Sequence, residues 1–255
     1  MLDWKFTTIE EHGAVAVVTF NRGEALNAFN EPLVRELTAV AHSFYDRHDI
    51  HAVVLTGSPK AFSAGADLKE RYGGASFASQ RDRSQLGRRL CRAWEEMPQI
   101  TVAAIEGLAV GAGVALAISC DWRTMAHPAY LYVPEVKIGL TLQWQAIPRL
   151  LSLVGPAKAK RIIVLCEKMP AQQALEWGLV DAVADEGEAV SEGLKLAEAA
   201  AKMPPEIVTM SKQAVNATTN ALHHATSFMD SDTSLLVRDA EPARRARDAF
   251  AKGQK

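Results

Sequence analysis

This chain of 255 residues has few cysteines and almost no net charge. The number of cysteines is odd, and Cys91, Cys120 and Cys166 lack the spacing of metal ligands. This is typical of thiols that fill apolar space in a protein of a reducing compartment. The 28 Lys and Arg residues nearly balance the 30 Asp and Glu residues, so the formal net charge is only -2. A balanced chain with 48 % hydrophobic residues is neither disordered nor built to bind nucleic acid.

Long apolar runs are absent as well. The most apolar stretch, residues 107–118, is too short and too rich in glycine to cross a bilayer. The N-terminal residues lack the basic and apolar regions of a signal peptide. The sequence therefore predicts a cytoplasmic protein that does not bind a membrane.

Strand-like and helix-like segments alternate over the first two thirds of the chain. Runs of β-branched residues predict strands at residues 14–20, 52–56, 101–105 and 122–126. Helices are predicted at residues 31–47, with Asn30 as the N-cap and Pro32 in the first turn, and at residues 80–96. This alternation is typical of parallel strands covered by helices, so the predicted class is α/β.

After Val180 the composition changes. Alanine-rich periodic sequence predicts helices at residues 186–202, 204–217 and 221–240, with almost no strand formers. We therefore expect the last third of the chain to be a helical appendage.

Two segments share one design, in which a strand leads through a turn of small residues into a helix. The first turn surrounds Gly65, and Asp67 is the expected cap of the helix that follows. The second turn follows Ile105, and its helix begins near Ala112. Backbone amides at a helix start are unpaired. Two such turns aimed at one point would form an oxyanion hole for a carbonyl that becomes an enolate.

Other interpretations of these features are weaker or simpler. Small residues often mark only a close contact of helix and strand. A dinucleotide fingerprint does not fit, because Leu116 stands where the third glycine after Gly111 and Gly113 belongs. The seven scattered histidines indicate no metal site. The arginine clusters at residues 81–92 and 244–247 suit either phosphate binding or a solvated helix face.

A set of motifs along residues 5–215 resembles the enoyl-CoA hydratase/isomerase (crotonase) family, in the order and spacing of that family. The motifs are Asn21-Arg-Gly-Glu-Ala-Leu-Asn-Ala28, Ala61-Phe-Ser-Ala-Gly-Ala-Asp-Leu68, the segment from Gly107 to Asp121, Pro134-Glu135 with Gly139, and Ala174-x-x-x-Gly-Leu-Val-Asp181. The resemblance implies a crotonase-like spiral of ββα repeats with a C-terminal helical trimerisation region. It places an acyl-CoA-binding core at residues 1–200 and a helical oligomerisation region at residues 201–255.

The resemblance also implies a substrate, an assembly and a site. The substrate is an acyl-CoA thioester, CoA enters only as part of it, and no metal or redox cofactor is needed. The assembly is a homotrimer or a dimer of trimers. The two oxyanion-hole amides fall on Ala66 and Ala112. The CoA-binding strip, made mostly of main-chain contacts, falls on Glu24, Ala25, Leu26, Ala64, Asp67, Leu68 and Lys69.

The acid/base residues depart from the pattern of the family's hydratases, which hold a water between two glutamates. Here the first position is Ala115, and only the second, Glu135, is a glutamate. One carboxylate suffices to remove an α-proton and return it elsewhere, as in the family's Δ3,Δ2-enoyl-CoA isomerases. Gln143 stands where dienoyl-CoA isomerases carry a third acid, which disfavours that reaction. Trp144 is expected in the core in preference to the substrate wall.

Three functions are therefore compatible with the sequence. The preferred hypothesis is double-bond isomerisation through a thioester enolate, with Glu135 as base and acid. One alternative is an enoyl-CoA hydratase that works with Glu135 alone. The other is a catalytically silent protein that binds acyl-CoA.

Overall fold

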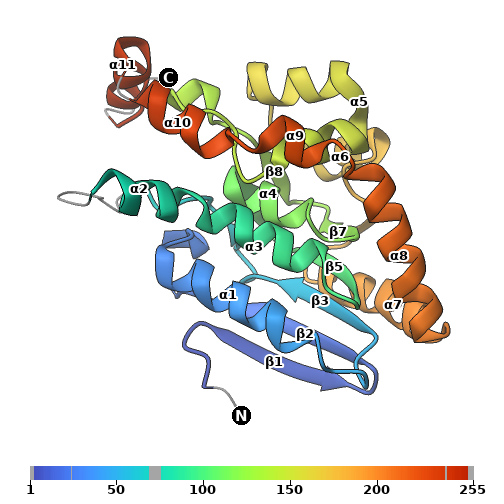
Figure 1. Cartoon of the computed structure of the whole chain (residues 1–255). Helices are drawn as coiled ribbons and strands as arrows, with labels where there is room; N and C mark the ends of the chain where they lie inside the picture. Colours follow the sequence, from blue (N-terminus) through green and yellow to red (C-terminus); the bar gives the residue numbers. More distant parts are fainter. Residues whose placement is uncertain (1–2, 24, 69–75, 239, 252–255) are drawn as a thin grey trace.

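The computed structural model describes residues 3–23, 25–68, 76–238 and 240–251. A sheet of six strands in the order β1-β2-β3-β5-β7-β10 forms its centre (Figure 1). These strands are β1 (Thr7–His12), β2 (Val15–Phe20), β3 (Ala52–Thr56), β5 (Ile100–Ile105), β7 (Trp122–Ala126) and β10 (Ala182–Ala184). Strand β1 is antiparallel to β2, and the other neighbours are parallel.

A second sheet is formed by four short strands. Its order is β4-β6-β8-β9, with β4 (Ala61–Ser63), β6 (Leu108–Val110), β8 (Tyr130–Tyr132) and β9 (Met169–Pro170). Each of β3, β5 and β7 in the large sheet is thus followed in the chain by a strand of the second sheet. The predicted α/β class with a spiral of ββα repeats is confirmed.

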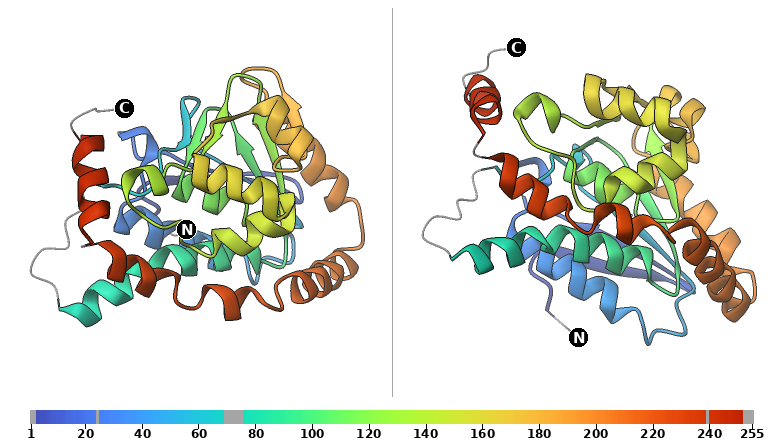
Figure 2. Two further views of the ribbon diagram at one scale, coloured as in Figure 1. Left: turned by 90° about the horizontal axis from the view of Figure 1, so that it is seen from above. Right: turned by 45° about the horizontal axis from the view of Figure 1, so that its top comes forward.

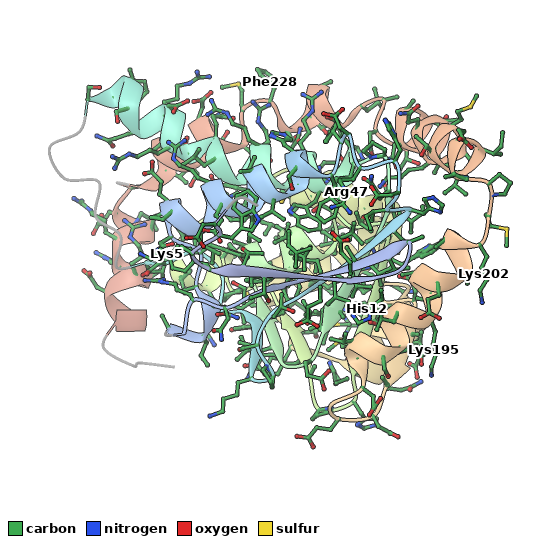
Figure 3. The ribbon with its side chains drawn as sticks, turned by 90° about the horizontal axis from the view of Figure 1, so that it is seen from below. Lys5, His12, Arg47, Lys195, Lys202 and Phe228 are labelled. Atoms are coloured by element: carbon green, nitrogen blue, oxygen red, sulfur yellow. The ribbon has the colours of Figure 1, made fainter. Side chains whose placement is uncertain are left out.

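The core lies on both sides of the large sheet. Strands β3 and β5 are buried over their whole lengths, because their continuous apolar runs are covered on both faces. Helices α1 (Glu31–Ser43) and α3 (Leu86–Glu95) pack together, and α7 (Ala189–Ala201) packs on β3 and β5. Figure 3 shows β1 between the labelled Lys5 and His12, with Arg47 on one side of the strands and Lys195 of α7 on the other.

Strand β1 was not predicted, the helix predicted at residues 31–47 ends at Ser43, and the one predicted at residues 221–240 is two helices, His223–Ser227 and Asp230–Arg238. The other predicted elements agree with the structure except at two further places. The four predicted strands are present, and Asn30 Oδ1 accepts from Leu33 N at 3.1 Å, as expected of an N-cap. The helix predicted at residues 80–96 is two helices, α2 (Phe77–Ser84) and α3, which meet at Gln85. The expectation of a purely helical appendage after Val180 is wrong in part, because β10 extends the large sheet and α7 covers it. A strand of three residues is too short to show a period in the sequence.

The remaining elements surround this body. They are η1 (Ala25–Asn27), α4 (Ala112–Ala117), η2 (Val136–Ile138), α5 (Ala146–Leu165), α6 (Ala171–Trp177), α8 (Pro205–Thr219), α9 (His223–Ser227), α10 (Asp230–Arg238) and α11 (Glu241–Ala251). Helices α8 to α11 run along one side of the molecule, and α10 lies beside α2 (Figure 2). Among the described helices, none has the length and apolarity to cross a membrane.

Candidate active site

The two small-residue turns meet beside the second sheet. A methyl group built on Gly65 would lie 2.8 Å from Val110 O and 3.6 Å from Ala112 N. A methyl group built on Gly113 would lie 2.7 Å from Ser63 O. Only glycine lets two backbones pass this closely, and Gly65 also has a φ of +92°. The structure therefore brings together the two turns that the sequence could not place relative to one another.

The amide of Ala66 lies between two backbone hydrogen bonds made by its neighbours. Phe29 N donates to Gly65 O at 2.7 Å, and Asp67 N donates to Phe29 O at 2.9 Å. Ala66 N itself donates to no acceptor within the described residues. The flanking bonds fix the peptide and leave its N–H for a ligand oxygen.

The amide of Ala112 begins α4. Gly111 precedes it with φ +52° and ψ -112°, a conformation outside the helical region. As the first residue of the helix, Ala112 has no intrahelical acceptor for its N–H, and the described residues provide no other. Each turn thus contributes one amide whose hydrogen remains for a ligand.

Glu135 lies against the second turn. A methyl group built on Gly111 would come within 2.4 Å of Glu135 Oε1. The second carboxyl oxygen, Oε2, is buried without a hydrogen-bond partner in the described part of the chain. Burial raises the pKa of Glu135 to about 7. A carboxyl group with this pKa takes up and returns a proton near neutral pH.

Ala115 lies one turn along α4, where its amide donates to Gly111 O at 3.0 Å. Its methyl group is buried with 1 % exposure, so the position faces the interior. Asp67, the acid that follows the first turn, is engaged by Arg22 Nη1 at 2.6 Å. The helix that Asp67 was expected to cap would begin at Leu68 and continue through residues 69–75, which lie outside the described residues.

The strip predicted to hold CoA forms a left-handed turn at η1. Ala25, Leu26 and Asn27 have φ values of 50°, 50° and 56°. Leu26 O accepts from Ala64 N at 2.9 Å, which ties the turn to the segment before Ala66. Asp67 follows Ala66 in the chain, and the side chain of Leu68 after it is exposed. Glu24 and Lys69, also predicted for this strip, lie outside the described residues.

Asn27 is a residue that the reasoning from sequence missed. Its side chain is buried, with Nδ2 donating to Ala61 O at 3.2 Å and Oδ1 accepting from Arg22 N at 2.9 Å. Its carbonyl oxygen accepts from Ser63 Oγ at 2.8 Å. Left-handed backbone costs about 1–2 kcal/mol for each residue other than glycine, so these bonds maintain the turn. The signal in the sequence was the polar side chain of Asn27 between two apolar residues, Leu26 and Ala28.

A pocket of about 190 Å³ lies beside Ala66. Trp144 lines it and also packs on the core, as expected, with its ring centroid 5.6 Å from that of Phe29. Gly87 makes room for the indole, because a methyl group built there would lie 1.7 Å from Trp144 Cε2. Gln143 also lines the pocket, and its Nε2 donates to Ser234 Oγ at 2.8 Å.

A larger cavity, of about 670 Å³, lies between α8 and the end of α4. None of the described residues predicted for the site lines it. The smaller pocket reaches Ala66, whereas Glu135 and Ala112 stand outside its described lining. We assign the acyl group to the smaller pocket, because it adjoins the unpaired amide of Ala66.

The arginines of α2 and α3 are largely engaged with acids of this chain. The pairs are Arg81 with Asp232, Arg83 with Glu31, Arg89 with Asp82, and Arg92 with Glu96. In α11, Arg245 pairs with Glu241 and Arg247 donates to Gly139 O at 3.3 Å. Cys91 and Cys120 fill apolar space as predicted, because their thiols are buried, and burial raises their pKa values to about 12.

Residues 10–254 match the protein family described as Enoyl-CoA hydratase/isomerase. This chain belongs to the enoyl-CoA hydratase/isomerase family. The short-chain-enoyl-CoA hydratase of Clostridium acetobutylicum is 35 % identical over 209 residues, which cover 82 % of this chain and 80 % of that protein. The crotonyl-CoA hydratase of Syntrophomonas wolfei is 32 % identical over 209 residues, with the same coverage of 82 % and 80 %.

The structural comparison agrees. A crystal structure of an enoyl-CoA hydratase from Mycobacterium avium subsp. paratuberculosis superposes with a TM-score of 0.86 at 25 % identity, covering 99 % of this chain and 98 % of that chain. The resemblance read from the motifs is therefore confirmed, together with the crotonase fold. As a member, the chain is an enzyme of the enoyl-CoA hydratase/isomerase family that acts on acyl-CoA.

Proposed function

We propose that this enzyme moves the double bond of an enoyl-CoA by proton transfer through a thioester enolate, with Glu135 as the acid and base. The observation that supports this most strongly is the buried carboxyl group of Glu135 at Gly111, combined with alanine at position 115. One carboxylate can move one proton between two carbons, whereas concerted hydration as usually drawn needs two.

The reaction balances without any added group. The thioester oxygen of a 3-enoyl-CoA accepts hydrogen bonds from the amides of Ala66 and Ala112. The Glu135 carboxylate removes a proton from C2, and the electron pair of that C–H bond spreads over a dienolate whose charge rests on the thioester oxygen. The resulting carboxylic acid delivers the proton to C4. The double bond then lies between C2 and C3, and Glu135 is a carboxylate again.

The CoA part is proposed to lie along the strip from Glu24 to Leu26 and from Ala64 to Lys69, held mainly by backbone groups. The left-handed η1 turn supports this, because its strain is maintained by Asn27 in a segment whose Leu26 side chain stays 48 % exposed. No cofactor beyond the CoA of the substrate enters the proposal.

Hydration with Glu135 alone is the second candidate, because the relatives from Clostridium acetobutylicum and Syntrophomonas wolfei are both named hydratases. In that reaction the Glu135 carboxylate takes a proton from a water whose oxygen bonds to C3, and the acid form returns a proton to C2. The same two amides would hold the enolate oxygen.

Parallel assays separate these functions. We expect conversion of 3-hexenoyl-CoA to 2-hexenoyl-CoA, followed by the absorbance of the conjugated thioester, to exceed hydration of crotonyl-CoA by at least about 100-fold, the lower bound for a positioned acid/base group. Hydration at about 10 s⁻¹ or more would favour the hydratase instead. Neither reaction, with micromolar binding of acyl-CoA retained, would leave a silent binding protein.

A further inference from the structure

The pocket beside Ala66 extends away from the amide toward the C-terminal helices. Its lining comes from the start of α1, from α2 and α3, from Gln143 and Trp144, and from α10. Helix α10 lies beside α2 in Figures 1 and 2, and Arg81 of α2 pairs with Asp232 of α10 at 2.7 Å. Because Ala66 lines this space, we assign the acyl group of a thioester held there to it.

The volume of the pocket limits the acyl group. The pocket's volume is about 190 Å³. Trp144 is fixed at the wall by Phe29 and by the bare backbone of Gly87, so the pocket does not lengthen by a simple side-chain rotation. The space therefore suits a short acyl group.

The lining contains buried polar side chains beside its apolar ones. Ser231 and Ser234 are 3 % and 8 % exposed, and Gln143 reaches the same space. Ser234 Oγ accepts the hydrogen bond from Gln143 Nε2. The Ser234 hydroxyl hydrogen and Gln143 Oε1 have no partner within the described residues. An aliphatic chain would leave this donor and this acceptor unpaired, which costs binding free energy.

The charge of the described lining is balanced. Within the described residues, the charged side chains that line the pocket are Glu31 and Arg83, which pair at 3.3 Å. A carboxylate on the acyl group would gain no net attraction from such a pair. A neutral group that both donates and accepts a hydrogen bond matches the lining better.

We propose that this pocket selects a short acyl group that carries a hydroxyl at its far end, bound by the Ser234 hydroxyl and the amide oxygen of Gln143. The proposal deepens the proposed function and rests on it for the orientation of the thioester at Ala66. It assigns Gln143 and Ser234 as specificity-determining residues. In the bound complex, Ser234 donates to the oxygen of the ligand hydroxyl, whose hydrogen is donated to Gln143 Oε1.

Calorimetry with pairs of saturated acyl-CoA esters of equal size tests the selection. The pairs are 4-hydroxybutyryl-CoA with pentanoyl-CoA, and 5-hydroxypentanoyl-CoA with hexanoyl-CoA, because each replaces a terminal methyl by a hydroxyl group. We expect the hydroxylated ester of at least one pair to bind about fivefold more tightly, the effect of one net hydrogen bond. Tighter binding of the methyl-terminated thioester in both pairs would overturn the proposal, since an apolar pocket gives that order. Glutaryl-CoA, with a terminal carboxylate, should bind more weakly than 5-hydroxypentanoyl-CoA.

Two variants attribute the preference to the named side chains. Gln143→Met and Ser234→Ala should each reduce the ratio of the two dissociation constants to about one or invert it. The matched control is Gln172→Met, on the exposed surface of α6, which should keep the ratio of the parent protein. Because each ratio is measured within one variant, a general loss of stability does not imitate the expected result. An unchanged ratio in both pocket variants would overturn the assignment.

The outcomes also separate this inference from the proposed function. Exchange of the α-protons with solvent deuterium reports the chemistry, and the binding ratio reports the selection. Exchange without a preference for the hydroxylated ester would overturn the inference and leave the proposed function intact. A preference for the hydroxylated ester without exchange would overturn the proposed function and leave the selection by the pocket intact. No binding of any of these esters would overturn both.

Discussion

Burial of the Glu135 side chain prepares the carboxyl group for proton transfer and at the same time lowers the stability of the fold. Its pKa is about 7 in the folded chain against an ordinary value of 4.5. Since the folded pKa is raised, the stability present below pH 4.5 is lost as the pH rises through 7. Glu135→Gln should therefore increase the free energy of unfolding at pH 8 by up to about 3 kcal/mol, and by almost nothing at pH 4.

Urea titrations of both proteins at pH 4 and pH 8 measure this difference. The control is Glu198→Gln, at an exposed position of α7, which should change the stability little at either pH. Equal stability of the parent and Glu135→Gln at pH 8 would mean that the carboxyl group titrates as if it were exposed to water.

Ala115→Glu tests whether the missing second carboxylate limits hydration. The position is buried one turn after Gly111, and the resemblance assigns to it the first glutamate of the hydratases. We expect the substitution to raise the rate of crotonyl-CoA hydration by about 10²-fold, the lower range for a positioned base. Ala115→Gln has the same size but no base, so it should not do so. Thermal unfolding of both variants checks for overpacking. Equal hydration by the two folded variants would contradict the interpretation.

Individual residues of the candidate site could be proposed from the sequence where a motif encodes them. Glu135, Ala66 and Ala112 could be located from the small-residue turns and the resemblance. The convergence of the turns could not, because it depends on the bare Cα atoms of Gly65 and Gly113 meeting backbone from distant segments. The raised pKa of Glu135 also follows from tertiary burial, which no local pattern encodes.

Among the elements, α11 supports the loop that carries Glu135. A methyl group built on Gly139 would lie 2.4 Å from Ala243 O, and Gly139 has a φ of +70°. Gly139→Ala must therefore push α11 away as well as strain the backbone, and we expect it to reduce turnover by at least about tenfold, because small displacements of a catalytic group are costly. The matched control is Gly13→Ala, at a φ of +64° with no atom within 4 Å of the added methyl group.

Measuring kcat and thermal stability for both glycine variants separates the two effects. The Gly13 variant should lose only the stability that corresponds to a backbone strain of about 1–2 kcal/mol, and it should keep its turnover. A Gly139 variant that is destabilised as much as the Gly13 variant, yet fully active, would show that α11 does not position Glu135.

At the level of elements, long buried segments were easier to predict than short or polar ones. Strand β3 has the predicted bounds because its apolar residues form an almost continuous run. Strand β7 also has the predicted bounds, although Arg123 and Thr124 interrupt its apolar residues. Strand β1 was not predicted, since its sequence of two threonines, isoleucine, two glutamates and histidine places mostly polar groups on an edge. The break between α2 and α3 at Gln85 was also missed, because the polar sequence there continues the helical pattern.

For the whole molecule, the C-terminal helices present an apolar surface. Met203, Ile207, Met210 and Val215 in or before α8 are each more than half exposed. Phe228, which Figure 3 labels on the outer edge of the molecule, is also 52 % exposed. Exposed apolar side chains repeated along one helix are typical of an interface. We propose that it serves the trimer or dimer of trimers that the resemblance implies.

Light scattering should therefore give a mass in solution that is a multiple of three chains. Met210→Glu should shift the mass toward one chain, because a charge would be buried in the interface. A monomeric mass for the parent protein, or an unchanged mass for the variant, would contradict the use of α8 in assembly.

The whole account depends on enolate formation at this site, and exchange of the α-protons of butyryl-CoA with deuterium measures it directly. No double bond is needed, so the experiment does not depend on the natural acyl group. We predict that the parent protein and Glu198→Gln catalyse the exchange, as followed by mass spectrometry, with a rate that rises with pH through about 7 as Glu135 loses its proton. Glu135→Gln should bind the ester and exchange about 10²- to 10⁴-fold more slowly. Equal exchange by the parent and Glu135→Gln would contradict the central claim, because the base would then lie elsewhere.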